Sequence, residues 1–178
     1  LYTIQYGPLS VSTVRLETIF GDVAVAVNPT DSRYKKYIGT QIEVEFPWGT
    51  KTMPVIADEY VDPEFGTGAV KVTPYHDPND FMMWTNHKNE ISETPQPVIN
   101  TSGKLYNMST DSPLVPEQYA GLGIINARAA VLEAYKSYKS GLLLLETKGK
   151  YSHSVGVCYR CGRQIEPLPL PQFFIKVN

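Results

Sequence analysis

Several features that would each indicate a class of protein are missing from this sequence. No run approaches the roughly 18 to 20 consecutive apolar residues that a membrane-spanning helix needs. The first ten residues, LYTIQYGPLS, have neither the basic nor the apolar region of a secretory signal peptide. Only two cysteines occur among 178 residues, too few for the disulfide framework of a small secreted protein. We therefore expect a cytoplasmic protein that makes no contact with a membrane.

The sequence also has little net charge and no extreme of composition. With 16 Lys and Arg against 18 Asp and Glu its net charge is −2, so a nucleic acid would have to bind through a local basic patch. Apolar residues make up 42% and charged residues 19%, which is typical of one globular domain. Because the chain lacks an initiating methionine and ends in the strand-like PLPQFFIKVN, we expect residues 1–178 to be a single domain excised from a longer polypeptide.

Hydrophobic patterns predict many short strands and few helices. Runs typical of strands occur at 2–4, 9–13, 22–27, 41–46, 53–58, 69–73, 142–147 and 152–158. One helix is expected to begin after Asp77 with Pro78 in its first position, and a second to occupy 125–140 with Gly141 as its cap. Since no regular strand–helix alternation is visible, we expect an α+β fold with a mainly antiparallel or mixed, β-barrel-like core and peripheral helices.

The stretch GTGAVKVTPYHDPNDF concentrates charge between a strand and a helix. Asp77 suits the N-cap position, and Asp80 then falls in the third helical position, near free backbone N–H groups. Lys71 and Thr73 are expected to face outward from the strand. Such a cluster suits a small zwitterion, because carboxylates bind an ammonium group while Lys or Arg binds an oxyanion or phosphate. Helix capping alone is the alternative interpretation of the two aspartates.

A second polar junction lies earlier in the chain, with Arg15, Glu17 and Thr18. Of the three histidines, His76 is the best placed for a direct role, next to the expected helix start. The glycines of GTGAVK precede a strand, which excludes a Walker A phosphate loop and favours a bulge or a close backbone approach. No G-x-S-x-G elbow is present, so a Ser/His/Asp triad is not proposed.

The two cysteines form one C-x-x-C motif. Cys158 and Cys161 have the spacing of half a structural zinc site, which needs four ligands. The other pair would have to come from a longer parent chain. Asp77 and Asp80 are compatible with a divalent metal, but no further carboxylates are near them in the sequence. We therefore predict no metal within this chain, with zinc at the cysteines as the alternative.

Four ordered motifs give the sequence a resemblance to a known family. They are STVRLETIFGDVAVAVNPTDSRY, EFGTGAVKVTPYHDPNDF, AGLGIINARAAVLEA and HSVGVCYRCGRQIEPLPLPQFFIKV, and the resemblance that they carry extends over nearly the whole chain. The chain resembles the editing domain inserted into class I aminoacyl-tRNA synthetases, most closely that of the valyl enzymes, with residues 150–178 as the segment that returns towards the catalytic core. Lys71 and Thr73 favour the valyl over the leucyl and isoleucyl types. Two positions depart from the family: Leu16, which should alter only loop stiffness, and Tyr75, which should border the pocket.

The resemblance implies an activity and a set of site residues. An apolar valine pocket rejects near-isosteric threonine only about a hundredfold, a limit for which valyl-tRNA synthetases are the standard illustration. We therefore expect post-transfer editing, the hydrolysis of threonine from mischarged tRNA(Val). Because the ester is already activated, a positioned water suffices without a metal. By resemblance the catalytic residues are Lys71, Asp77 and Asp80, and the substrate-binding residues are Arg15, Glu17, Thr18, Thr73 and His76.

Each residue type suggests a role in that reaction. We assign Asp77 to the substrate ammonium and Asp80 to its side-chain hydroxyl, with the reverse assignment as the alternative. Lys71 and Arg15 would bind the terminal adenosine or phosphate and stabilise the developing oxyanion. The two threonines would hold substrate or water. Polar groups that a valine methyl leaves unpaired would provide the selectivity.

The resemblance also implies partners. They are the threonine-carrying 3′ end of tRNA(Val) and the rest of the synthetase chain, and the protein is expected to be a monomer. No cofactor is expected in this chain, while ATP and Mg²⁺ belong to the parent enzyme. Two alternatives stay open: an editing domain of the leucyl or isoleucyl type, and a non-catalytic, tRNA-binding structural insert.

Overall fold

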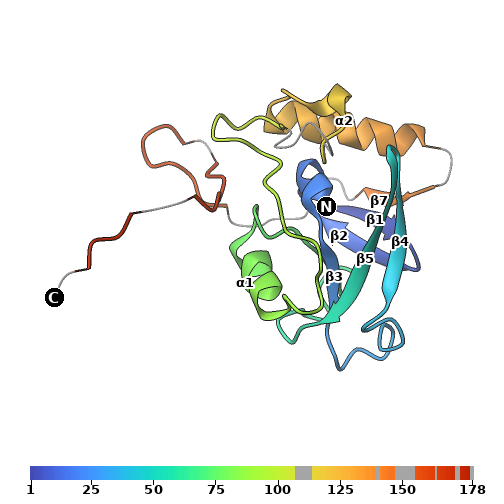
Figure 1. Ribbon diagram of the computed structural model, residues 1–178. Coiled ribbons are helices and arrows are strands. Elements are labelled where there is room, and N and C mark those ends of the chain that lie inside the picture. The colour runs from blue at the N-terminus through green and yellow to red at the C-terminus, as the bar shows by residue number, and fades with distance from the viewer. Residues whose placement is uncertain (107–113, 139–140, 147–154, 163, 171–172, 177–178) are drawn as a thin grey trace.

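Two β-sheets, one of three strands and one of four, form the body of the protein (Figure 1). The computed structural model describes residues 1–106, 114–138, 141–146, 155–162, 164–170 and 173–176. Within these residues the fold is a mixture of two sheets and a few helices, which confirms the predicted α+β class. The sheets pack beside each other but do not join into a closed barrel in the described part of the chain, so "barrel-like" describes the core only loosely.

The three-stranded sheet is built on a β-hairpin. β1 (Tyr2–Tyr6) and β2 (Leu9–Thr13) pair antiparallel across a tight turn, and β7 (Leu143–Glu146) pairs with the other edge of β1. Alternate residues of β2 are buried, because only one face of this sheet lies against the core. The strand order is β2-β1-β7.

The four-stranded sheet has a fully buried strand next to its edge. All residues of β3 (Ala24–Val27) are buried, as its continuous β-branched and apolar sequence predicts. β5 (Gly49–Ala57) runs parallel to β3, and β6 (Ala69–Val72) runs antiparallel on its other side. β4 (Gln41–Phe46) pairs antiparallel with β5 and alternates exposed with buried residues. The order is β4-β5-β3-β6, so the sheet is mixed.

Helical segments connect and cover the sheets. The buried 3-10 helix η1 (Leu16–Gly21) links β2 to β3, and α1 (Pro78–Asn86) follows β6. The short η2 (Glu117–Tyr119) precedes α2 (Ile124–Ser137), which packs on η1 and lies across one end of the sheets (Figure 1). No helix among the described residues combines the length and apolar character that crossing a bilayer requires.

Most predicted elements are present, and the differences have local causes. The 3-10 helix η1 was missed, because so short a turn has no hydrophobic period. α2 ends before the predicted cap at Gly141, since Tyr138 is already extended. Of the predicted strand 152–158, residues 152–154 lie outside the described residues, and residues 155–158 form one isolated bridge, between Val157 and Gln164.

The turn before β6 explains why GTGAVK needs its second glycine. Gly68 has a φ of +76°, and a Cβ there would clash with the guanidinium of Arg33 and lie 2.8 Å from the carbonyl oxygen of Pro63. The backbone conformation alone should cost Gly68→Ala about 1–3 kcal/mol of unfolding free energy, and the clash should add to it. Gly39→Ala is the matched control, because Gly39 has the same φ with no atom within 4 Å of a Cβ. Urea unfolding should show the larger loss for Gly68→Ala, and equal losses would contradict a role for the close approach.

Candidate functional site

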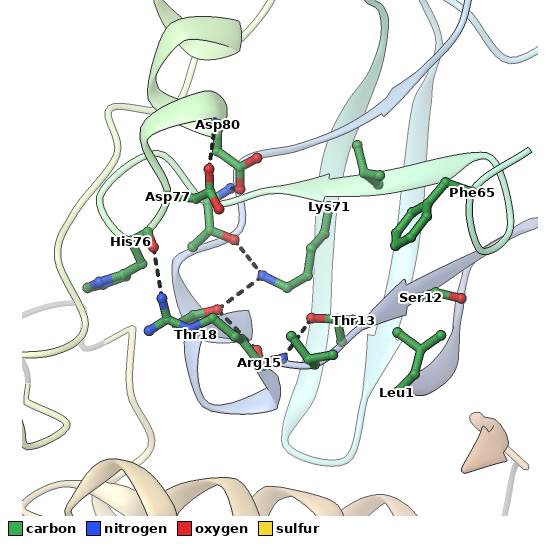
Figure 2. Close-up of a pocket in the computed structure, with 13 residues that line it drawn as sticks. Leu1, Ser12, Thr13, Arg15, Thr18, Phe65, Lys71, His76, Asp77 and Asp80 are labelled. Carbon is green, nitrogen blue, oxygen red and sulfur yellow. Dashed lines mark hydrogen bonds between the residues drawn. The ribbon is translucent and has the colours of Figure 1, made fainter. Parts of the chain in front are cut away.

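Two polar segments far apart in the sequence face each other across a cavity. The segment around Arg15 and Thr18 lies opposite the stretch from the end of β6 to the first turn of α1 (Figure 2). The cavity has a volume of about 190 Å³. Its polar lining contains every predicted site residue except Glu17: Arg15, Thr18, Lys71, Thr73, His76, Asp77 and Asp80. Sequence reasoning missed the rest of the lining, which comprises Leu1, Ser12, Thr13, Val14, Phe65 and Val70.

Lys71 lies at the centre of a buried hydrogen-bond network. Its ammonium donates to the Thr18 hydroxyl at 3.1 Å, to Asp22 Oδ1 at 2.9 Å and to the Thr73 hydroxyl at 2.5 Å. These contacts occupy all three N–H donors of the ammonium group. Lys71 and Thr73 therefore do not face outward as predicted: Lys71 is 9% exposed and Thr73 2%. The side chains turn inward because a buried carboxylate compensates the charge.

Sequence reasoning also missed Asp22, which binds Lys71 and Thr73 but does not itself line the cavity. It is fully buried, and besides Lys71 it accepts hydrogen bonds from the hydroxyls of Thr73, at 2.5 Å, and Tyr6, at 2.6 Å. Burial, and after it the charge of Asp22, raises the pKa of Tyr6 well above its usual value. A usable signal was in the sequence: an aspartate at the start of the apolar run 22–27 is expected to be buried and must then be paired.

Asp77 and Asp80 lie at the start of α1, as predicted. Oδ1 of Asp77 accepts the N–H groups of Asn79, at 2.8 Å, and of Asp80, at 3.4 Å, which confirms Asp77 as the N-cap. Oδ2 of Asp80 accepts the backbone N–H of Thr73 at 2.8 Å. Burial, and then the nearby charge of Asp77, raises the pKa of Asp80 to about 7. Among the described residues, the second oxygen of each carboxylate has no hydrogen-bond partner.

Arg15 lines the cavity, whereas Glu17, two residues later, does not. The Arg15 guanidinium donates to the His76 carbonyl oxygen at 2.9 Å and to Glu17 Oε1 at 3.2 Å, and it also pairs with Glu166. Glu17 is fully buried behind Arg15, where Arg128 binds it at 2.7 and 2.8 Å. Burial acts to raise the pKa of Glu17, but Arg128 and Arg15 together lower it below its usual value. The structure thus places Glu17 outside the lining of the cavity.

His76 offers its backbone to the site and its ring to the interior. The carbonyl binds Arg15, while the ring is buried and extends away from the two aspartates (Figure 2). Its Nε2 accepts the backbone N–H of Val98 at 2.9 Å. Burial, and then the charges of Arg15 and Lys71, lowers the pKa of His76 to about 3, so the ring is neutral. Its one hydrogen is therefore on Nδ1.

The two positions that depart from the family lie outside the cavity lining. Leu16 is fully buried in the core at the start of η1, where it does more than stiffen a loop. Tyr75 does not border the 190 Å³ cavity but lines two neighbouring ones, together with Leu168 and Pro169. The substitution therefore changes the surroundings of the site rather than its polar lining.

The two cysteines lie close together on one turn. Cys158 is half-buried and Cys161 exposed, and both are free on a tight turn closed by the Gly162 N–H to Cys158 carbonyl bond of 2.8 Å. Backbone hydrogen bonds from Cys161 and Arg160 lower the pKa of the Cys158 thiol, which favours the thiolate that a metal needs. Among the described residues no cluster of three or more His, Cys, Asp or Glu is placed to hold a metal.

Comparisons with known proteins identify relatives of this chain. A family model described as the leucyl-tRNA synthetase editing domain matches residues 22–131. The valine–tRNA ligase of Carboxydothermus hydrogenoformans is 44% identical over 184 residues, covering 100% of this chain and 19% of that protein. The valine–tRNA ligase of Treponema denticola is 42% identical over 170 residues, covering 96% of this chain and 17% of that protein. The chain spans about a fifth of the length of these curated relatives.

A solved structure shares the fold. The crystal structure of GlLeuRS-CP1 superposes with a TM-score of 0.58 over 82% of this chain and 84% of that chain, at 13% sequence identity. At this identity the likeness concerns the arrangement of sheets and helices alone. The family model matches more than half of the chain, and valine–tRNA ligases resemble it along its whole length. The chain therefore belongs to the family of aminoacyl-tRNA synthetase editing domains, and its similarity within that family is to the domain of valine–tRNA ligases.

Proposed function

We propose that this chain hydrolyses the ester of tRNA(Val) mischarged with threonine, the editing reaction of a valyl-tRNA synthetase. One observation carries the proposal: Asp77, Asp80, Lys71 and Arg15 line one cavity of about 190 Å³, and each aspartate keeps one carboxylate oxygen without a hydrogen-bond partner among the described residues (Figure 2). Two acceptors match the ammonium and the hydroxyl of threonine. The cations match the negative charge of the nucleotide phosphate and the charge that develops on the ester oxygen during attack.

The two aspartates suit different groups of the substrate. Asp80, with a pKa near 7, can accept or donate a hydrogen bond at neutral pH, which fits a neutral hydroxyl. We therefore keep the ammonium with Asp77 and the threonine hydroxyl with Asp80. A valine methyl at the same place would leave a desolvated carboxyl oxygen unpaired, which costs about 1–3 kcal/mol or more. This difference in binding between threonine and valine would provide the selection against valine that an apolar pocket alone cannot provide.

The cations and hydroxyls would act on the ester and the water. The hydroxyls of Thr18 and Thr73, which accept hydrogen bonds from Lys71, would each accept one more from the water that attacks the carbonyl carbon. Because its three donors are occupied, Lys71 would stabilise the developing oxyanion through its charge or by exchanging one partner. Arg15 would hold the phosphate or ribose of the terminal adenosine. No metal takes part in these steps, and binding of ATP and Mg²⁺ would belong to the rest of the enzyme.

The proposal is tested by deacylation of Thr-tRNA(Val) beside Val-tRNA(Val). We expect the chain to release threonine faster than valine. Asp80→Asn should lower the rate for the threonyl ester by about 10- to 100-fold, the range of a hydrogen bond to a charged group. Asp62→Asn is the matched control, because the same substitution falls on an exposed turn residue and should leave the rate unchanged.

Two outcomes would point elsewhere. Threonine release that is equal in folded Asp80→Asn and in the unchanged chain would favour a non-catalytic, tRNA-binding insert, in which Asp77 and Asp80 only order the start of α1. Faster hydrolysis of mischarged tRNA(Leu) or tRNA(Ile) would favour an editing domain of the leucyl or isoleucyl type. The partner in every case is the 3′ end of an aminoacyl-tRNA.

A further inference from the structure

We propose that Arg128, on α2 and outside the cavity, is a positioning residue for the site: through the buried carboxylate of Glu17 it fixes the guanidinium of Arg15 at the wall of the cavity. The inference deepens the proposed function and rests on it for its kinetic test. A separate spectroscopic test is independent of any activity.

One buried carboxylate holds two guanidinium groups. Arg128 binds Glu17 in a bidentate manner, with Nε 2.7 Å from Oε2 and Nη2 2.8 Å from Oε1. Arg15 Nε shares Oε1 at 3.2 Å. The Glu17 side chain is 0% exposed, whereas Arg128 is 32% and Arg15 19% exposed. Glu17 is therefore the fixed point between a residue of the cavity and a residue of α2.

The sharing of this carboxylate determines where Arg15 is held. Because Arg128 takes both oxygens, Arg15 makes only one, longer contact to Glu17. Its other nitrogens remain available for the His76 carbonyl, at 2.9 Å, and for Glu166. These contacts hold the guanidinium against the cavity wall beside Thr18 (Figure 2). Arg128 thus prevents Arg15 from binding both oxygens of Glu17.

Removal of Arg128 would change this balance. A buried carboxylate without full compensation is costly, and Arg15 is the other cation that contacts Glu17 in the described structure. We expect Arg15 to take the bidentate position of Arg128 and to leave the His76 carbonyl and the cavity. A residue that only fastened α2 to the core would instead affect stability and leave Arg15 in place.

Arg128→Ala and Arg128→Lys test the proposal, with Lys136→Ala as the matched control. Lys136 lies on the same helix and pairs with Glu133 and Glu146, away from the cavity. The first readout is the NMR resonance of the Arg15 Nε–Hε group, assigned with Arg15→Lys. It should shift in Arg128→Ala. It should shift less in Arg128→Lys, because lysine keeps a positive charge beside Glu17 although it cannot bind both oxygens, and it should stay unchanged in Lys136→Ala.

The second readout is kcat/KM for deacylation of Thr-tRNA(Val). Misplacement of Arg15 should lower it on the order of 10- to 100-fold in Arg128→Ala, with partial recovery in Arg128→Lys. An unchanged Arg15 resonance in Arg128→Lys and in folded Arg128→Ala would overturn the proposal. If the unchanged chain hydrolyses no mischarged tRNA, the proposed function fails, but the Arg15 resonance still decides the positioning role. If Arg128→Ala does not fold, Arg128→Lys decides it.

Discussion

Asp22→Ala is expected to lower the free energy of unfolding by about 3–5 kcal/mol, the cost of leaving a buried charge without its partner. The ammonium of Lys71 would lose the counter-charge that lies 2.9 Å from it, at a position where the lysine is 9% exposed. The Tyr6 hydroxyl would lose its acceptor as well. Urea unfolding measures the effect.

A double variant separates the lost charge pair from lost packing. Asp22→Asn keeps the shape of the side chain, and Lys71→Met removes the ammonium. If the buried charge is the cause, the combination should be more stable than Asp22→Asn alone, because replacing both partners leaves no charge uncompensated. Glu146→Gln, which breaks a partly exposed pair with Lys136, should cost only about 0–1 kcal/mol. A double variant less stable than both single variants would contradict this account.

Between pH 4 and 7 the protein is expected to lose stability relative to Asp80→Asn as the pH rises. The pKa of Asp80 is raised from 3.8 to about 7 in the folded protein, so its ionisation is harder there than in the unfolded chain. The folded state then binds more protons across this window, and the slope of stability with pH is negative. At about 1.4 kcal/mol per pKa unit, the shift of the Asp80 pKa corresponds to a loss of roughly 4 kcal/mol of unfolding free energy between pH 4 and 7.

The difference in unfolding free energy between the unchanged chain and Asp80→Asn separates the contribution of Asp80 from that of His76. The pKa of His76 is lowered to about 3, so His76 contributes the opposite slope: stability is lost as the pH falls below 6.5. That contribution is present in both proteins and cancels in their difference. Unfolding in urea at intervals from pH 4 to 8 should show the difference growing up to pH 7 and then levelling. A constant difference would contradict the raised pKa, and Asp62→Asn should show no such trend.

Local sequence patterns determined much of the fold. Asp77 before Pro78 marked the start of α1, because capping and proline chemistry depend on adjacent residues. The apolar run of β3 and the alternation of β4 located two strands of one sheet, since strand burial repeats every two residues. The meeting of the Arg15 and Lys71 segments was expected from resemblance to the family, and the cavity lining confirms it.

The tertiary structure decided how the charges of the site are compensated. Nothing in the neighbourhood of Asp22 in the sequence specifies Lys71 as its partner, and Glu17 gives no sign of Arg128, which is 111 positions away. The same holds for Glu166, which contacts Arg15 from 151 positions away. Periodicity and capping act over a few residues, whereas the cost of burying a charge is met by whichever group the fold brings within hydrogen-bonding distance. The sequence, through its resemblance to the family, therefore indicated seven of the residues that line the cavity, and only the tertiary structure decided which other residues hold them in place.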